Sequence, residues 1–187
     1  AFALMHLGRY SQAAERFQQT LKFYPKNARG YAIKNLGRID MAQGNLEAAQ
    51  QNLLDALSLF RAADDVNGLG QTLGCLGITE LRLGNLTHAQ DYIDENRLLA
   101  ANTLIILPSM TALSSSALLR AEQGDVESSI ALYAAALQSG HVANSSWYSD
   151  VIGQSIDAAS ESLPMEAIKV AKARGKAGSW QSVVRDM

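Results

Sequence analysis

The sequence predicts an all-α protein in which antiparallel helix pairs stack into a solenoid. A short phrase that begins with glycine recurs four times, at Gly8, Gly44, Gly84 and Gly124, with spacings of 36, 40 and 40 residues. Apolar residues at helical spacing lie on both sides of these glycines. A fixed period of this length is typical of repeat proteins, whose units bury their apolar faces against their neighbours. Because such stacks work by their surface, the sequence predicts a binding scaffold.

The repeat divides the chain into five units of one domain, residues 1–187. They are a partial unit of about residues 1–27, three full units of residues 28–67, 68–105 and 106–143, and a degenerate capping unit of residues 144–187. A terminal unit of atypical sequence is expected, since the end of a stack must be shielded from water. The pattern begins in the middle of a helix, so we expect the chain to be a fragment of a longer protein.

The unit of residues 28–67 shows the predicted helix pair most clearly. Apolar residues from Tyr31 to Met41 precede the glycine at helical spacing, and those from Leu46 to Phe60 follow it. Gly44 suits the left-handed conformation that ends the first helix. Asn45, like Asp125 in a later copy, suits the cap of the second helix. A turn this tight makes the two helices antiparallel neighbours.

Small and large residues recur at fixed offsets from the glycines. Ala49 and Ala89 lie five residues after a glycine, and Gly37 and Gly77 lie seven before one, where we expect helices to approach closely. Large residues nine positions after each glycine are expected to fill the space between units: Phe17, Leu53, Ile93 and Tyr133.

Beyond Gly140 the repeat becomes irregular, but three more helices are predicted. They run from about Trp147 to Ser160 after a serine-rich cap, from Pro164 to a break at residues 172–178, and from Trp180 to Met187 with Ser179 as cap. An uncharged stretch from Leu98 to Leu119 is long enough for a membrane span. It contains a proline and several hydroxyl residues and crosses a junction between units, so we expect it to be buried solenoid interior.

These residues resemble the tetratricopeptide repeat family. The matching residues are Leu36, Gly37, Gly44, Ala49, Leu53 and Ala56 in one unit, Leu76, Gly77, Gly84, Ala89 and Ile93 in the next, and Tyr10, Ala13, Phe17 and Pro25-Lys26-Asn27 in the first. The resemblance implies a right-handed α-α superhelix, here of about 10–11 helices. The period of 40 departs from the family's usual length of about 34, and Ala117 and Ser129 replace the expected glycine and alanine.

The long period and the C-terminal run resemble one variant of the family in particular. The run from Ser145-Ser146-Trp147 through Leu163-Pro164 to Ala173-Arg174-Gly175-Lys176 is similar to the C-terminal tail of large bacterial transcriptional regulators of the LuxR and SARP types. That resemblance implies a sensor region for signal transduction, attached to DNA-binding and NTPase domains.

In the tetratricopeptide family the first helix of each unit lines a concave groove. Carried over to this chain, that implies a peptide-binding or protein-binding surface of Tyr31, Lys34, Arg38, Met41, Gln71, Ile78, Arg82, Thr111, Ser114 and Leu118. Lys34 and Arg38 are four residues apart and project from one helix face, so they suit an acidic segment; the alternative is an ordinary solvated face. The family's carboxylate clamp needs asparagines where this chain has Arg38 and Cys75, so that function is not implied.

Composition and motifs argue against other classes of function. The formal net charge of −2 gives no basic footprint for direct nucleic-acid binding. The histidines His6, His88 and His141 lack the spacing of metal ligands, and no glycine phrase matches a phosphate loop. We therefore expect that the chain is not an enzyme and has no catalytic, metal-binding or cofactor-binding residues. We also expect that it needs no cofactor and makes no contact with a membrane. The single cysteine, Cys75, cannot form an internal disulfide and fits a reducing, cytoplasmic location.

The sequence therefore predicts a protein–protein interaction scaffold that binds a peptide or a helix in its groove. The partner would be another protein or another domain of the same polypeptide. The alternative is a structural role as a homodimerisation module through the C-terminal helices, suggested by Trp147, Trp180, Val183 and Val184.

Overall fold

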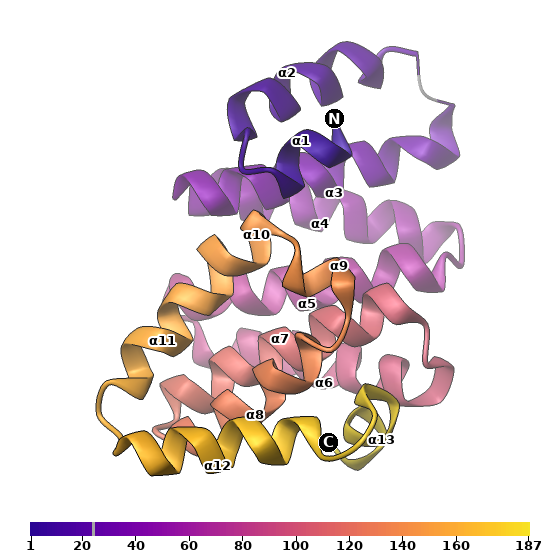
Figure 1. Cartoon of the computed structure of the whole chain (residues 1–187). Coiled ribbons are helices and arrows are strands. Elements are labelled where there is room, and N and C mark those ends of the chain that lie inside the picture. Colours follow the sequence, from indigo (N-terminus) through magenta and orange to yellow (C-terminus); the bar gives the residue numbers. More distant parts are fainter. Residues whose placement is uncertain (24) are drawn as a thin grey trace.

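The computed structural model describes residues 1–23 and 25–187, and all regular elements in this part of the chain are helical (Figure 1). The first eight helices are α1 (Phe2–His6), α2 (Tyr10–Leu21), α3 (Lys26–Gln43), α4 (Leu46–Ala62), α5 (Val66–Arg82), α6 (Leu86–Thr103), α7 (Ile106–Glu122) and α8 (Val126–Ala136). They pack in neighbouring pairs, α3 with α4, α5 with α6 and α7 with α8. The predicted all-α class is confirmed.

The C-terminal region contains the remaining helices. These are α9 (Gly140–Ala143), α10 (Ser146–Tyr148), the π-helical η1 (Ser149–Gly153), α11 (Gln154–Ser160), α12 (Met165–Lys176) and α13 (Trp180–Asp186). The described residues thus form thirteen α-helices and one π-helical segment. This exceeds the expected 10 or 11 because residues 140–160 are divided among four of these segments. The three helices predicted after residue 144 are all present, with Ser145 and Ser179 as side-chain caps, but α12 continues to Lys176, past the start of the predicted break at residues 172–178.

The turn glycines adopt the predicted left-handed conformation. Their φ angles are 72° at Gly8, 80° at Gly44 and Gly84, and 82° at Gly124, a region that side chains with a Cβ rarely occupy. The predicted caps differ from each other. Asp125 accepts a hydrogen bond from the Ser128 amide at 3.2 Å, whereas Asn45 holds the N-cap position without a capping bond from its side chain.

The small residues lie where helices approach closely, as predicted. A Cβ added to Gly37 would be 2.9 Å from Leu53 Cγ, and one added to Gly77 would be 2.5 Å from Ile93 Cγ1. Both distances are shorter than van der Waals contact, so each glycine makes room for the large residue of its partner helix. Leu53 and Ile93 were expected to fill the space between units, but these contacts place them inside their own helix pairs. The recurring offsets in the sequence therefore encode the packing within each pair.

The centre of the molecule is formed by α5 and α7, which lie against each other. Almost every residue of α5 from Gly68 to Leu81 is buried, and so is α7 from Pro108 to Leu119. The prediction that the uncharged stretch from Leu98 to Leu119 is buried holds for residues 108–119 but is wrong for most of residues 98–107, where Leu98 is 67% and Ile106 is 53% exposed. None of the described helices is both long enough and apolar enough to cross a membrane.

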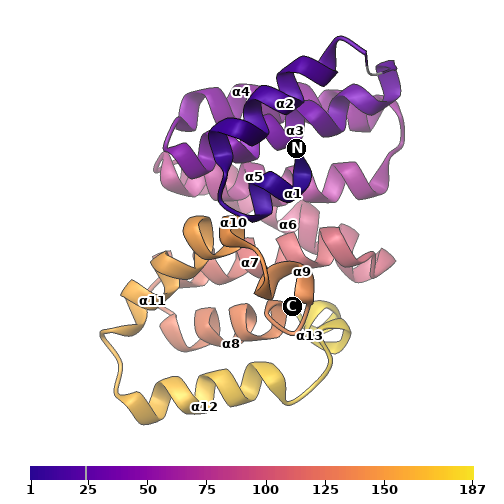
Figure 2. The same cartoon turned by 45° about the horizontal axis from the view of Figure 1, so that its top comes forward.

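The chain turns back on itself after α8. Residues 140–153, which comprise α9, α10 and η1, return toward the N-terminal helices; we call them the return segment. Figures 1 and 2 both show α10 next to the indigo and purple N-terminal half, while α12 lies at the opposite end of the molecule against α8. The last helix, α13, packs against α6, α7 and α8.

Candidate functional site

Most of the predicted groove residues are buried. They lie on α3, α5 and α7, and eight of the ten have almost no exposed surface: Lys34, Arg38, Met41, Gln71, Ile78, Thr111, Ser114 and Leu118. Tyr31 is half-buried and Arg82 is exposed. The expectation of an open trough, or of a solvated face at Lys34 and Arg38, therefore differs from the structure, because these side chains are covered.

The return segment covers the face of α3 and α5 that carries Lys34, Arg38 and Arg82, which we call the inner face. The Trp147 side chain is fully buried, and its Nε1 donates a hydrogen bond to the Arg38 carbonyl oxygen at 2.7 Å. Arg82, at the end of α5, donates from Nη2 to the Val151 carbonyl at 2.6 Å and from Nη1 to the Met41 carbonyl at 3.2 Å. Arg82 thus links α3, α5 and the return segment instead of offering its guanidinium to an acidic partner.

Three further side chains attach the return segment to the helices around it. His6 Nδ1 and Ser145 Oγ are 2.5 Å apart, which joins α1 to the residue before α10. In addition, the Tyr10 hydroxyl donates to Asp150 Oδ2 at 2.5 Å, and the Tyr133 hydroxyl donates to the Tyr148 carbonyl at 3.2 Å. The inner face therefore holds a helical segment with polar contacts from α1, α2, α3, α5 and α8.

Lys34 is a buried amine close to a second basic side chain, Arg38. Its side chain is 1% exposed, and Nζ donates to Gln71 Oε1 at 2.6 Å. Nζ also lies 5.2 Å from the centre of the Tyr31 ring. Desolvation, followed by the positive charge of Arg38, lowers the pKa of Lys34 from its ordinary value of 10.5 to about 7. The Lys34 ammonium is in no ion pair with a residue that the structure describes.

Arg38 is enclosed by aromatic rings rather than by carboxylates. The side chain is 2% exposed, and its guanidinium carbon lies 3.9 Å from the centre of the Trp147 ring and 5.7 Å from that of Tyr148. Such cation–π contacts stabilise a desolvated arginine by about 2 kcal/mol. Nε and Nη2 are buried, and neither has a hydrogen-bond partner in the described part of the chain. The guanidinium is thus stacked but not neutralised.

Two histidines lie near these cations. The ring centres of His6 and His141 are 4.9 Å apart, and His141 also packs edge-on against Tyr148 at 5.8 Å. Desolvation and the nearby Arg38 charge lower the pKa of His6 to about 3 and that of His141 to about 4. Both rings are therefore neutral at physiological pH, and they add no further positive charge beside Lys34 and Arg38.

The predicted groove residues on α7 pack against neighbouring helices. A Cβ added to Gly74 of α5 would be 2.7 Å from Thr111 Cβ, so Thr111 lies at the contact between α5 and α7. Ser114 and Leu118 are buried on the same helix. These three side chains do not form an exposed lining in the structure, because the close approach of α5 and α7 covers them.

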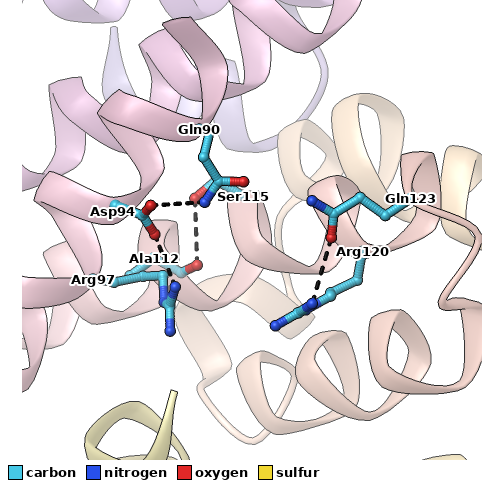
Figure 3. Close-up of polar contacts among 7 residues, drawn as sticks. All are labelled: Gln90, Asp94, Arg97, Ala112, Ser115, Arg120 and Gln123. Carbon is cyan, nitrogen blue, oxygen red and sulfur yellow. Dashed lines mark hydrogen bonds and ion pairs between the residues drawn. The ribbon is translucent and has the colours of Figure 1, made fainter. Parts of the chain in front are cut away.

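A second polar region lies at the other end of the molecule. A cleft of about 540 Å³ is lined by residues of α6, α7, α8, α12 and α13, among them the arginines Arg97, Arg120 and Arg174. Arg97 forms an ion pair with Asp94 at 2.8 Å, and Arg120 contacts Gln123 Oε1 at 3.4 Å. Figure 3 shows Arg97 and Arg120 extending toward the same open space from α6 and α7. We call this region the arginine cleft.

The residues that suggest self-association are only partly available. Trp147 and Val184 are buried within the chain, whereas Trp180 and Val183 are half-buried against the core. Trp147 therefore presents no surface to a second copy in this structure. Homodimerisation stays a prediction, and of the four residues that suggested it only Trp180 and Val183 are partly accessible.

Sequence reasoning missed the part that Trp147 and Tyr148 play on the inner face. Both lie outside the repeat register, and Trp147 contacts a residue 109 positions earlier in the chain. The available signal was an aromatic pair directly after a serine cap, in a unit whose period had degraded. The arginine cleft was missed as well, because its residues come from five helices and share no motif.

In comparisons with known proteins, the chain matches no family model, no curated protein and no solved structure. Its function must therefore be inferred from its own contacts.

Proposed function

We propose that this chain is a protein-interaction scaffold, a tetratricopeptide-like right-handed solenoid whose inner face binds a helical peptide. The 40-residue period and the neighbouring helix pairs support the solenoid. The observation that carries the binding function is the return segment, because a helix of the chain itself already lies on this face. Helix-in-groove recognition of this kind uses a few large apolar anchors, and Trp147 is such an anchor.

The return segment acts in this proposal as an internal ligand. Its contacts with Arg38, Arg82 and Tyr10 support this role, because the inner face offers a guanidinium that stacks on an aromatic ring as well as directed hydrogen bonds. A segment joined to its site by a short linker has an effective concentration in the millimolar range. An external helix therefore gains access when the return segment is released or when the external helix binds more tightly.

The proposed biological setting rests on the resemblance of the long period and the C-terminal run to those of large bacterial transcriptional regulators. We propose that the chain is the sensor or regulatory region of a bacterial signalling protein or transcriptional regulator, located in the cytoplasm. Its partner would be a protein or another domain of the same polypeptide. In this role it needs no cofactor and performs no chemistry, so binding alone transmits the signal.

A peptide in trans tests the proposal. The probe is a fluorescein-labelled peptide with the sequence of residues 139–160, and the control is the same peptide with Trp147→Ala. The receptor is the chain carrying Trp147→Ala, whose own return segment is weakened. We expect the parent peptide to bind this receptor about tenfold or more tightly than the control peptide, as for a tryptophan hot spot, and to bind the unaltered chain less tightly because the internal segment competes.

A second receptor variant is the control for misfolding of the first. Asp150→Ala removes the carboxylate that accepts from the Tyr10 hydroxyl and changes only the return segment, so this receptor should also bind the peptide, which keeps Asp150, more tightly than the unaltered chain. Circular dichroism and a cooperative unfolding transition establish that both receptors are folded. Equal anisotropy changes for the two peptides, or none with either folded receptor, would contradict the proposed function.

A further inference from the structure

The inner face contains two buried basic side chains that form no ion pair with a described residue, and the Asp65 carboxylate only partly offsets the desolvation that lowers the pKa of Lys34 to about 7. Lys34 and Arg38 are 1% and 2% exposed, and no carboxylate among the described residues pairs with either of them. Three of their nitrogen-bearing neighbours, His6, His141 and Gln71, are neutral at physiological pH. Moving a charged group out of water is strongly unfavourable unless it is paired or fully hydrogen-bonded. The pair therefore opposes folding of the chain in the state observed here.

The nearest acidic side chains are engaged elsewhere. Asp65 accepts hydrogen bonds from the Tyr31 hydroxyl and from the Gly68 amide, both at 2.8 Å. Asp150 accepts from the Tyr10 hydroxyl. Arg38 has two buried nitrogens without a partner in the described part of the chain, and Lys34 can donate three hydrogen bonds, of which one reaches Gln71. Unused donors and uncompensated positive charge thus coincide at one place.

We propose that Lys34 and Arg38 form a binding site for one oxyanion, a carboxylate or a phosphate, carried by the helix that binds the inner face. This inference rests on the proposed function and names the chemistry of the partner. Trp147 occupies the position next to the guanidinium in the observed state. When the return segment leaves, the acidic group of the partner takes its place and pairs with both cations.

The geometry suits such a group. A guanidinium binds a carboxylate or a phosphate through two parallel hydrogen bonds, and Nε and Nη2 of Arg38 are the two adjacent donors that lack a partner. Charge pairs buried at an interface are coupled much more strongly than exposed ones. The site therefore discriminates between an acidic helix and its neutral counterpart.

The test changes one position of the peptide of residues 139–160. Peptides with Trp147→Glu and Trp147→Gln are compared, and so are peptides with phosphoserine and with serine at that position. The receptor is the chain carrying Trp147→Ala. We expect each acidic peptide to bind about tenfold or more tightly than its neutral control. The larger of the two differences tells whether a carboxylate or a phosphate is preferred.

Two receptor variants assign the effect to Arg38. In the receptor that also carries Arg38→Met, the preference for the acidic peptides should disappear. Arg120→Met, a matched change in the arginine cleft, should leave the preference unchanged. Equal loss of preference in both variants would indicate general electrostatic attraction and would overturn the site.

A measurement within one chain separates this inference from the proposed function. The chains with Trp147→Glu and Trp147→Gln differ only in one charge, so we expect the first to unfold at a higher denaturant concentration, and the difference to vanish when Arg38→Met is added. Peptides that fail to bind in trans would contradict the proposed function alone. The oxyanion site would be overturned if the peptides bound without a preference for the acidic ones and the two chains were equally stable. That outcome would leave the proposed scaffold function unaffected.

Discussion

The inner face and the arginine cleft hold the same kinds of side chain in opposite environments. At the inner face, Arg38 is buried under Trp147 with two nitrogens that have no partner in the described part of the chain. In the cleft, Arg97 is 28% exposed and pairs with Asp94, and Arg120 is solvated beside Gln123. Water screens the charges of the cleft, whereas Lys34 and Arg38 of the inner face are buried and form no ion pair with a described residue.

This difference identifies the site with the larger capacity for selective binding. Exposed ion pairs contribute about 0–1 kcal/mol, so a partner gains little by replacing one. A buried cation destabilises the folded chain until an anion pairs with it. The site therefore favours an acidic partner over a neutral one. The four predictions below test this contrast, in order of decreasing effect.

The largest effect is expected at the two tryptophans. Trp147→Ala removes a fully buried anchor of the inner face and should lower the free energy of unfolding by about 3–5 kcal/mol. Trp180→Ala, at a half-buried residue of α13 near the cleft, should cost about 1–2 kcal/mol because less apolar surface is lost. Urea denaturation of both variants measures the difference. Equal losses would show that the return segment is not anchored by Trp147.

Substitution of Arg38 at the inner face and of Arg120 in the arginine cleft should change stability by different amounts. Arg38→Met removes an uncompensated buried charge, which costs several kcal/mol, and also removes a cation–π contact that contributes about 2 kcal/mol. We expect a net gain in stability of about 1–3 kcal/mol. Arg120→Met should change stability by less than about 0.5 kcal/mol, as at other exposed sites. A marked destabilisation by Arg38→Met would show that the guanidinium is held by favourable contacts and would break the contrast.

Lys34 should make stability depend on pH. Its folded-state pKa of about 7 lies below its ordinary value of 10.5, so above pH 7 the unfolded chain binds a proton that the folded chain lacks. Stability should therefore rise with pH, by at most about 1.4 kcal/mol per pH unit, and the full penalty should persist below pH 7.

The pH measurement compares the unaltered chain with Lys34→Met between pH 6.5 and 8.5 in urea. Burial raises the pKa of Cys75, so titration of the thiol lowers stability at higher pH, and the window ends before it. In the variant only the rise due to His6 and His141 should remain, and it should end by about pH 7.5 because their ordinary pKa is 6.5. Parallel curves would mean that Lys34 is solvated and charged throughout.

The smallest effect is expected for the ion pair of the cleft. Asp94→Asn leaves Arg97 in water without its charged partner and should change stability by less than about 1 kcal/mol. Added salt should reduce the effect further, since it screens exposed charges. A loss of several kcal/mol would place Arg97 in a buried environment and remove the distinction between the two regions.

The elements that the sequence predicted correctly depend on local patterns. Gly44 ends a helix because only a residue without a Cβ easily adopts φ of 80°, and Gly37 faces Leu53 because both belong to one helix pair. These relations repeat at a fixed spacing, so a single sequence reveals them. The helices after residue 144 were found from their serine and proline boundaries.

The return segment could not be predicted in the same way. The Trp147 side chain meets Arg38 across 109 residues, and no period relates the two. The ten groove residues were inferred from the first helix of each unit. They lie on α3, α5 and α7 as expected, but the inference took no account of a helix folding back over them. Burial of Lys34 and Arg38 depends on that long-range contact, and so does the absence of a compensating carboxylate among the described residues.

The most direct test of the account is the exchange rate of the two indole protons, followed by NMR in deuterated buffer. Trp147 Nε1–H is buried and donates to the Arg38 carbonyl, so it should exchange orders of magnitude more slowly than the indole proton of half-buried Trp180. Arg82→Met, which loosens the return segment, should speed exchange at Trp147 alone. Equal, rapid exchange at both indoles in the unaltered chain would show that the inner face is open, and would contradict the account.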